Sequence, residues 1–536
     1  MKLRTSLVLT GLSLSLCVAC VDSTCDDTNS CPHGTAGAAG SGGTAGTSGS
    51  GGTSGGTGGT AGNGGSAGSG GSAGAGATGG TAGAAGSGGT GPQCDPTSLP
   101  GDDACVIDDE YGVFVSPSGS DSNGGTMAAP FATVGKGLQE AKAAGKRLYV
   151  CADGGSFAET VSLSAANAGI SAWGSFKCAD WTYDGSLKAR VAPTSEGYAL
   201  TADSVNSATL LDGFEFESQS ATQAGGSSVA AFVKTSSALT LSHVKLVAGS
   251  GMKGADGVRS DYTQPSGVDG GDATVATGGT GTEYTQCPGG GTTKGGDGGP
   301  LSFGGASGTR SPGTTPANAG VGGAVCGSGG LGGLGEPGLE GTAGTASSAL
   351  GTLDGTGWIP ADSGAGTPGT IGQGGGGGRG GTSGGGGGGG AGGCGGSPGG
   401  GGKGGGASIA LLLVNSPITL TDSELVSGAA GAGGKGSDGQ EGLIAGLGGR
   451  RAGTAGTSGC DGGDGGQGGP GGGGAGGPGG VSAGILHLGT APTVTGGSIT
   501  SGTAGAAGVG GKAGASGSKA ADGLPGVAEQ IREVTN

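Results

Sequence analysis

Large side chains and positive charge are scarce in this chain of 536 residues. Aromatic residues make up 3% of it, and 23 Lys and Arg face 39 Asp and Glu, for a net charge of −16. A nucleic-acid-binding surface needs a basic face, so the charge argues against that class of function. Beyond the first 20 residues no apolar run is long enough to span a bilayer, since the best one, Ile409 to Val414, has the length of a strand.

Motifs for metals and nucleotides are also missing. The mature chain has no Cys-x-x-C, and of the three histidines (His33, His243, His487) only His33 lies near a cysteine, so zinc is not expected. No Gly-Lys-Ser/Thr follows a strand, which excludes a phosphate loop. We therefore expect no cofactor. Asp-Gly clusters at residues 460–464 and 295–299 leave weak extracellular calcium binding open.

Glycine, by contrast, fills 151 positions and falls on every third residue from Gly34 to Gly58, Gly453 to Gly480 and Gly502 to Gly517. Such segments bury almost no side chain. Collagen would need abundant proline, and only Pro470 and Pro478 lie between Gly453 and Gly480. Two interpretations stay open: disorder, or packed polyglycine helices with three residues per turn, which would place bare backbone along one edge.

The N-terminus has the layout of an export signal. Positive charge at Met1 to Arg4 precedes an apolar stretch from Leu7 to Leu16, which is too short for a membrane span. Cys17-Val-Ala-Cys20 resembles a bacterial lipoprotein box, and the resemblance implies a lipid on Cys20 as the first mature residue. By the same resemblance, Val21 fits sorting to the outer membrane. Secretion as a soluble protein is the alternative.

An even number of cysteines beyond the signal and the lipid position predicts an oxidising compartment and a disulfide framework. Pairing of sequence neighbours is the simplest connectivity, although the sequence does not prove it. A loop as long as 394–460 would remove about 4 kcal/mol of unfolded-chain entropy when closed. The candidates are Cys25, Cys31, Cys94, Cys105, Cys151, Cys178, Cys287, Cys326, Cys394 and Cys460, paired 25–31, 94–105, 151–178, 287–326 and 394–460.

Residues 94–250 hold nearly all the aromatic side chains and are the segment able to bury a core. Short alternating runs such as Ala238 to Val247 predict strands, and Thr133 to Ala144 predicts one helix. The stretches Val113 to Thr126 and Ala129 to Val134 resemble the opening of pectin-lyase-like parallel β-helix proteins. That resemblance implies that the helix caps one end of the coil.

Internal repetition points to the same architecture. Residues 408–428 align without gaps to 482–502, residues 228–249 align to both with one gap, and residues 198–218 fit more loosely. Inward positions would include Leu411, Leu413, Ile418, Leu420 and Leu425. One coil cannot bury its apolar face alone, whereas stacked coils can. We predict an all-β fold, a right-handed parallel β-helix interrupted by long Gly-rich loops (disordered or polyglycine-II-like), with one N-terminal capping helix.

The predicted organisation follows these signals. It is a signal peptide at 1–19, a lipid-anchor and short Cys segment at 20–33, a Gly/Ser/Thr/Ala linker at 34–93, the N-terminal β-helix part at 94–250, a Gly-rich insertion at 251–406, a coil at 407–428, a second insertion at 429–481, a coil at 482–502 and a Gly-rich tail at 503–536. The last residues, 526–536, predict a short helix.

A search for catalytic chemistry yields no catalytic residue. Enzymes of the pectin-lyase-like class, by resemblance, use clustered aspartates with a nearby Arg or Lys, or paired aspartates with a His-Gly. The repeated coils carry no Asp-Asp pair, and Val rather than Gly follows His243. Acid–base catalysis needs paired groups with a placed partner, so we predict a non-enzymatic protein. The candidates weighed are Asp203, Asp212, Glu215, Glu217, Lys188 and Arg190, together with the histidines His243 and His487.

The glycine tracts resemble the repeats of PGRS-type glycine-rich surface proteins and of glycine-rich bacterial lipoproteins. The N-terminal domain of the mycobacterial PGRS members is absent here, so the resemblance implies only a surface location. Together with the lipoprotein box, it leads us to predict a lipoprotein of the cell outer membrane or cell surface with a structural, adhesive or matrix-interaction role. Its partners would be the membrane, through the N-terminal lipid, and polysaccharide or other surface components. The alternative is a secreted or anchored carbohydrate-active or carbohydrate-binding parallel β-helix protein, either a polysaccharide lyase or a hydrolase.

Overall fold

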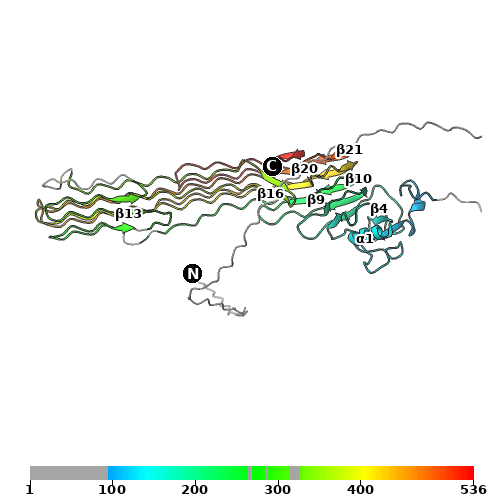
Figure 1. Cartoon of the computed structure of the whole chain (residues 1–536), viewed down its shortest axis with the longest axis horizontal. Coiled ribbons are helices and arrows are strands. Elements are labelled where there is room, and N and C mark those ends of the chain that lie inside the picture. Colours follow the sequence, from blue (N-terminus) through cyan, green and yellow to red (C-terminus); the bar gives the residue numbers. More distant parts are fainter. Residues whose placement is uncertain are drawn as a thin grey trace, which may run out of the picture. The chain divides into compact units, whose positions relative to one another are not determined.

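Three parallel sheets and one α-helix dominate the regular structure of this nearly all-β protein (Figure 1). The computed structural model describes residues 94–263, 265, 268–284, 286–313, 326 and 329–535, and every statement below concerns these residues. Within them no helix is both long and apolar enough to cross a membrane. The predicted signal, lipid position and linker lie outside the described residues.

Each large sheet is assembled from strands far apart in the sequence. The seven-stranded sheet contains β1 (Gly112–Val115), β2 (Arg147–Cys151), β4 (Ser171–Phe176), β7 (Thr209–Asp212), β10 (Leu239–Ser242), β18 (Thr419–Thr421) and β21 (Thr493–Thr495). The five-stranded sheet contains β5 (Ala189–Val191), β8 (Phe214–Glu217), β11 (Lys245–Val247), β19 (Glu424–Val426) and β22 (Ser498–Thr500). The six-stranded sheet contains β3 (Val161–Ser164), β6 (Leu200–Asp203), β9 (Ser228–Lys234), β17 (Ser408–Val414), β20 (Ser482–Leu488) and β23 (Ala528–Glu533).

Consecutive strands belong to the three sheets in a fixed, repeating order. β9, β10 and β11 belong to the six-, seven- and five-stranded sheets, and the next two sets of three strands repeat this circuit. Ser408 pairs with Ser482, as the gap-free alignment predicts. Ser408 also pairs with Ser228, whereas Thr419 pairs with Thr240, so the single predicted gap falls between these strands. The internal repeat read from the sequence is therefore confirmed by the strand register.

The space enclosed by the sheets is filled with apolar side chains. The five predicted inward residues of the coil at 407–428 are all buried and belong to one core cluster. Fully burying a Leu or Ile contributes about 1.5–3 kcal/mol. The cluster continues to α1 (Val134–Ala144), whose Leu138 and Ala141 cover the end of the core near β1 and β2. The predicted helix is confirmed, with the Thr133 hydroxyl accepting the Lys136 N–H at its start.

Two corners of the circuit use left-handed backbone. Thr235 and Asn415 follow strands of the six-stranded sheet, and His243 and Asp422 follow strands of the seven-stranded sheet, all with φ between 43° and 49°. Gly489 stands at the first corner of the last coil, with φ 87°. Asn, Asp, His and glycine tolerate this conformation better than β-branched residues, so Thr235 is the exception among them. Each coil therefore turns at the same two places.

The outer face of the six-stranded sheet is also covered. The hairpin of β15 (Gly351–Asp354) and β16 (Gly357–Pro360) comes from the first glycine-rich insertion and places the buried Leu353 in a second apolar cluster on this face. Ile409 and Leu412 of β17 belong to that cluster, whereas Leu411 and Leu413 belong to the inner core. A strand buried on both faces reads as a continuous apolar run, which explains Ile409 to Val414.

The glycine-rich segments all leave the sheets at one corner. They connect β11 to β17, β19 to β20 and β22 to β23, each time from the five-stranded to the six-stranded sheet. Most of their residues form extended chains, here called the glycine threads, that run side by side away from the strands (Figure 1). A small antiparallel sheet interrupts them, made of β12 (Glu283–Tyr284), β13 (Thr292–Lys294) and β14 (Thr309–Ser311).

Two further elements complete the described chain. A short 3₁₀-helix, η1 (Ala104–Val106), precedes β1. The helix predicted over residues 526–536 is wrong, because Ala528–Glu533 forms β23 and pairs in parallel with β20. Ile531 lies opposite Ile485 in this register. The edge of the six-stranded sheet offers backbone partners that outweigh the local helical preference of these residues.

Candidate functional site

The glycine threads form a bundle held by backbone hydrogen bonds at every third residue. Along one parallel pair, the N–H groups of Gly387, Gly390 and Gly393 donate to the carbonyls of Cys460, Gly463 and Gly466 at 2.9–3.0 Å. The ladder continues to the start of β17, where Ser408 donates to Val481 at 2.8 Å. The bundle and the six-stranded sheet therefore share one continuous hydrogen-bonded pairing.

The central thread, residues 384–406, is bonded to neighbours on several sides. Gly386, Gly387 and Gly388 donate to Gly299, Cys460 and Gly271, which lie on three different threads. The next three N–H groups return to the same three threads in the same order, at Gly296, Gly463 and Val268. This rotation is expected of chains with three residues per turn. The described tracts are thus packed, and the disorder interpretation does not apply to them.

Backbone contact explains why these positions are glycine. A Cβ atom at Gly387 would overlap the carbonyl oxygen of Gly449, and one at Gly389 would overlap that of Gly375. The overlap is with backbone, so no side-chain movement could relieve it. Residues 384–397 are all buried although they include few side chains. The interior of the bundle consists of peptide groups.

Aspartates add a second kind of link between parallel threads. Gly257 donates to the carbonyl of Lys435 at 2.7 Å, and the Lys435 N–H donates back to Asp256 Oδ1 at 2.7 Å. Asp269 and Asp438 make the same reciprocal contact with Leu447 and Lys512. We call this arrangement, an Asp before a thread glycine with its carboxylate on the facing N–H, the aspartate clasp.

The aspartates of the Asp-Gly clusters, which were considered as calcium sites, also accept hydrogen bonds from backbone N–H groups of facing threads. Asp461 accepts the N–H of Arg451, Asp464 that of Gly448 and Asp297 that of Gly281, each at 2.7–2.8 Å. Among the described residues no group of three or more His, Cys, Asp or Glu side chains is placed to hold a metal ion. Sequence reasoning missed the clasps, although the recurring Asp before a triplet glycine was the visible signal.

Inside the bundle, the disulfides do not join cysteines that are neighbours in the sequence. Cys94–Cys105 and Cys151–Cys178 are formed as predicted. The expected pairs 287–326 and 394–460 are wrong, since Cys287 bonds Cys394 and Cys326 bonds Cys460. Threads that touch are not neighbours in sequence, as the bond from the Cys460 N–H to the Arg379 carbonyl illustrates. Cys20, Cys25 and Cys31 lie outside the described residues.

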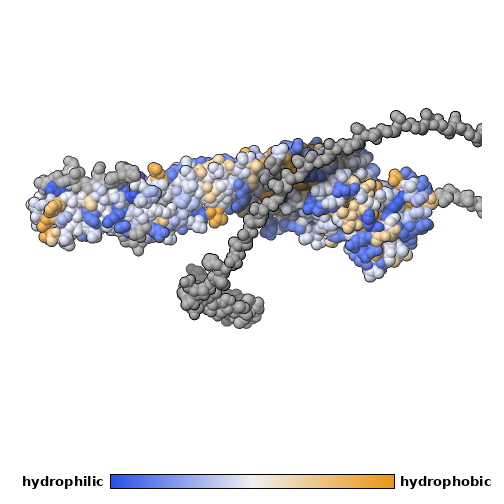
Figure 2. All heavy atoms as spheres, in the orientation of Figure 1, coloured by the Kyte–Doolittle hydropathy of each residue, from blue (hydrophilic) through white to orange (hydrophobic). Residues whose placement is uncertain are grey.

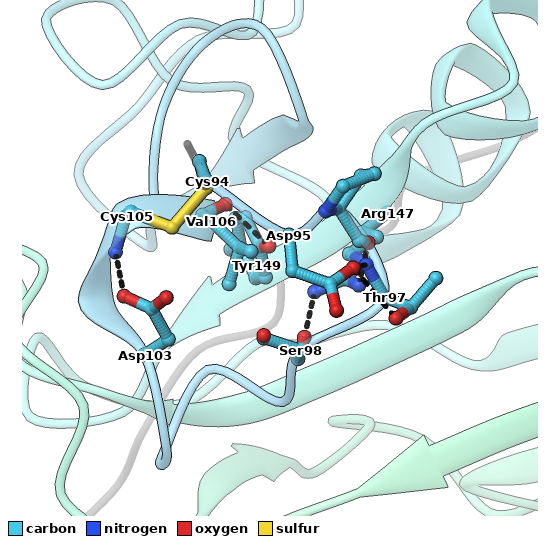
Figure 3. The surroundings of a disulfide bond; sticks show 10 residues. Cys94, Asp95, Thr97, Ser98, Asp103, Cys105, Val106, Arg147 and Tyr149 are labelled. Carbon is cyan, nitrogen blue, oxygen red and sulfur yellow. Dashed lines mark hydrogen bonds between the residues drawn. A yellow bond between two sulfur atoms is a disulfide. The ribbon is translucent and has the colours of Figure 1, made fainter. Parts of the chain in front are cut away.

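The first disulfide secures the chain that leads into β1 (Figure 3). Beside it the Tyr149 hydroxyl donates to the Val106 carbonyl at 2.8 Å, and Arg147 Nη1 donates to the Ser98 carbonyl at 2.7 Å. Burial raises the pKa of the Tyr149 hydroxyl, which keeps it a donor. Side chains of β2 thus fix the segment closed by Cys94 and Cys105.

Three of the weighed catalytic candidates meet at the corner between β10 and β11. Lys188 Nζ donates to the His243 carbonyl at 2.5 Å, and His243 Nδ1 lies 2.9 Å from Asp212 Oδ2. Burial lowers the pKa of Lys188, against the carboxylate of Asp212. Ser242 Oγ lies 3.0 Å from the same Nδ1. A Ser-His-Asp relay needs the two partners on different ring nitrogens, so this geometry does not form one.

The other charged candidates form a neutralised row on the outside of the five-stranded sheet. In the strand register Glu215 lies between Arg190 and Lys245, and Lys245 lies between Glu215 and Glu424. Arg190 Nε donates to Glu217 Oε2 at 3.0 Å. Opposite charges facing each other across strands stabilise a sheet modestly. Glu215 and Glu217 are both ion-paired with Arg190.

The last two candidates lie apart from this corner. Asp203 accepts hydrogen bonds from Ser204 and Thr235 at the other corner of the circuit, and these bonds lower the pKa of its carboxyl group. His487 is buried at the end of β20, opposite Leu413, with Nδ1 2.9 Å from the Gly489 carbonyl. Both residues have structural partners.

Comparisons of the chain with protein-family models, with curated proteins and with solved structures found no match.

Proposed function

We propose that the chain is a non-enzymatic lipoprotein of the cell surface with a structural, adhesive or matrix-interaction role. In this proposal a lipid on Cys20 holds it in the outer membrane, and a right-handed parallel β-helix carries the glycine bundle. The observation that supports it most is the bundle itself. Its interior is backbone, so its chemistry is confined to the side chains on its surface.

The repeated circuit through three parallel sheets supports the β-helix assignment. Each coil contributes one strand to each sheet, and the inward residues of successive coils stack in register. A scaffold of this kind holds a long insertion at a fixed corner. The glycine insertions all use the corner between the five- and six-stranded sheets.

The surface of the bundle supports a contact role. Figure 2 shows pale and blue colours along most of it, with scattered orange residues. Exposed Leu334, Leu339 and Ile444 supply small apolar contacts among hydroxyl and carboxylate side chains. Surfaces made of many small polar groups bind through numerous weak contacts rather than through one deep pocket.

The test replaces three interior glycines in one full-length chain, Gly387→Val, Gly389→Val and Gly390→Val. Cells carrying this variant should lose surface adhesion while the protein keeps its sheet core, judged by tryptophan fluorescence. Mass spectrometry of the N-terminus and protease treatment of whole cells should show a lipid-modified Cys20 and accessible threads. Unmodified protein in the medium, or unchanged adhesion, would refute the proposal.

The carbohydrate-active alternative has one observation in its favour. Lys188 has a lowered pKa and lies beside Asp212 and His243, which is the setting of a base on a β-helix surface. Release of sugar ends by the full chain, lost in Lys188→Ala, would establish an enzyme. No release across neutral and acidic polysaccharides, with or without calcium, would leave the surface role.

A further inference from the structure

Trp358 is the only tryptophan in the glycine-rich part of the chain, and it lies on the hairpin that covers the six-stranded sheet. It pairs in register with the buried Leu353. A Cβ atom at Gly351 would collide with its indole ring, so the ring lies flat against this glycine. The hairpin therefore holds the indole in a fixed position on the outer face of the sheet.

The indole N–H is an unusual group in this position. Nε1 is fully buried, and within the described part of the chain it has no hydrogen-bond acceptor. Buried donors in native proteins are nearly always bonded, and those that are not call for an explanation. The rest of the indole is only partly buried, so the ring, and not its N–H, is the surface that a bound molecule could contact.

Two hollows flank the indole, and Trp358 lines both. One, of about 380 Å³, is also lined by Leu350, Val527, Arg532 and Glu533. The other, of about 430 Å³, is lined by Tyr198, Glu196, Ser227 and Val229. Each hollow is within the lower range of small-ligand sites. The hairpin therefore separates two adjoining spaces that share one aromatic side chain.

The lining combines apolar surface with hydrogen-bonding groups of both kinds. Burial raises the pKa of the Tyr198 hydroxyl, so it remains a donor. Arg532 is paired with Glu529 at 2.8 Å and presents further N–H groups. Glu196 and Glu533 supply acceptors. A pyranose ring matches this set, because it has an apolar C–H face for an aromatic ring and hydroxyls around its edge.

From this arrangement we infer that the face around the hairpin binds a neutral polysaccharide, with Trp358 between two adjoining sugar positions. Acids outnumber the single arginine in the two hollows, which disfavours an acidic polymer. The accessible part of the ring would lie against a sugar face, and the hydroxyls of the sugar would bond to the polar side chains of the hollows. The inference does not rest on the proposed surface role, since a secreted protein could bind in the same way.

Binding is tested on the full mature chain with neutral hexasaccharides of glucose, xylose, mannose and N-acetylglucosamine. At least one should bind in calorimetry and shift the indole N–H resonance of Trp358, but not those of Trp173 and Trp181. Trp358→Phe keeps an aromatic ring but provides less surface for a sugar face than the indole, so it should weaken binding about tenfold. Trp181→Phe, whose indole donates to the Met127 carbonyl, is the matched control and should bind normally.

Two results would overturn the inference. One is the absence of binding by all four hexasaccharides. The other is binding that leaves the Trp358 resonance in place and is unchanged in Trp358→Phe, which would locate the sugar elsewhere. Neither result depends on lipidation or cell adhesion, so failure here is distinguishable from failure of the proposed function.

Discussion

The sheet core and the glycine bundle fill their interiors in opposite ways. Inside the sheets, side chains such as Leu241 and Leu411 are buried, and the backbone lies around them. Inside the bundle, the backbone itself is buried and most side chains lie outside, apart from a small buried cluster of Ile371 and the Cys287–Cys394 disulfide. The first interior is stabilised mainly by removing apolar surface from water, the second by saturating backbone hydrogen bonds. One chain thus contains two interiors that should respond differently to the same kind of substitution.

The largest expected effect comes from the disulfides, which close much longer loops in the bundle than in the sheet region. Cys287–Cys394 and Cys326–Cys460 close loops of 107 and 134 residues, whereas Cys94–Cys105 closes one of 11. Loops of about 100 residues contribute roughly 4.7 kcal/mol by chain entropy. Replacing Cys287 and Cys394 by Ser should lower the free energy of unfolding of the bundle by about 4 kcal/mol, measured by hydrogen exchange in the threads.

The matched control replaces Cys94 and Cys105 by Ser. It should cost less, about 3 kcal/mol or below, and leave the exchange of the threads unchanged. If both double variants accelerate exchange in the threads equally, the bundle is not an independently constrained region.

A core truncation should affect the sheets by a similar or smaller amount. Leu411→Ala removes a fully buried side chain from the inner core and should cost about 3 kcal/mol in urea unfolding followed by tryptophan fluorescence. Leu339→Ala, on the exposed surface of a thread, should cost less than about 0.5 kcal/mol. Comparable losses would mean that Leu339 is buried in solution, contrary to its exposed position on the thread.

Adding a single methyl group to a buried glycine should, in contrast, destabilise the bundle and leave the sheets unaffected. Gly389→Ala places a Cβ against the Gly375 carbonyl and should cost the bundle about 2 kcal/mol, by analogy with overpacked cores. Hydrogen exchange should quicken in residues 384–406 and remain slow in β9 and β17. Gly355→Ala, where a Cβ meets no atom within 4 Å, is the control and should change neither. Slow exchange in Gly389→Ala threads would contradict the backbone-filled interior.

The smallest expected effect is that of acid on stability. Acid should destabilise the bundle through Asp256 but should not destabilise the sheet core through Glu159. Bonds from Lys253 and from the Lys435 N–H lower the pKa of Asp256, so its contribution is present above the unfolded pKa and lost as the pH falls through the folded value. Burial raises the pKa of Glu159, which accepts the Val134 and Gly135 N–H groups, so acid should not weaken the folded state through that group.

The protection factor of the Lys435 amide, which is its exchange rate relative to that of an unfolded chain at the same pH, measures this response from pH 6 downward. It should fall in acid in the unmodified chain and lose most of its pH dependence in Asp256→Asn. The protection factors of Val134 and Gly135 should not fall over the same range. Acid weakening of both regions to the same extent would show that the clasp carboxylates do not hold the threads together.

Local patterns predicted the sheet region well and the bundle only in part. The aligned coils at 407–428 and 482–502 carry distinctive apolar positions, so their register could be read directly. Glycine triplets look alike wherever they occur, so period three left both disorder and packing open and did not say which threads meet. The same ambiguity led to the wrong partners for Cys287 and Cys460.

The β15–β16 hairpin and the corner with Lys188, Asp212 and His243 illustrate two further limits of prediction from the sequence. Trp358 stood alone in a glycine-rich tract, and nothing in its neighbourhood indicated that it folds back onto a distant sheet. Lys188, Asp212 and His243 were weighed separately, since they come from different coils and only the turn of the chain brings them together. Contacts between elements that carry no shared pattern could not be read from one sequence.

The shared exit corner of the glycine insertions has a consequence for how such a protein can vary in length. Because threads repeat every three residues, inserting one triplet in an outgoing thread and one in its returning partner, at the turn where they meet, lengthens both by about 9 Å and leaves the contacts between that turn and the sheets in register. The strand register of the sheets would not change, since none of their residues move along the chain. The length of the bundle can therefore change in steps of one triplet while the sheets stay the same.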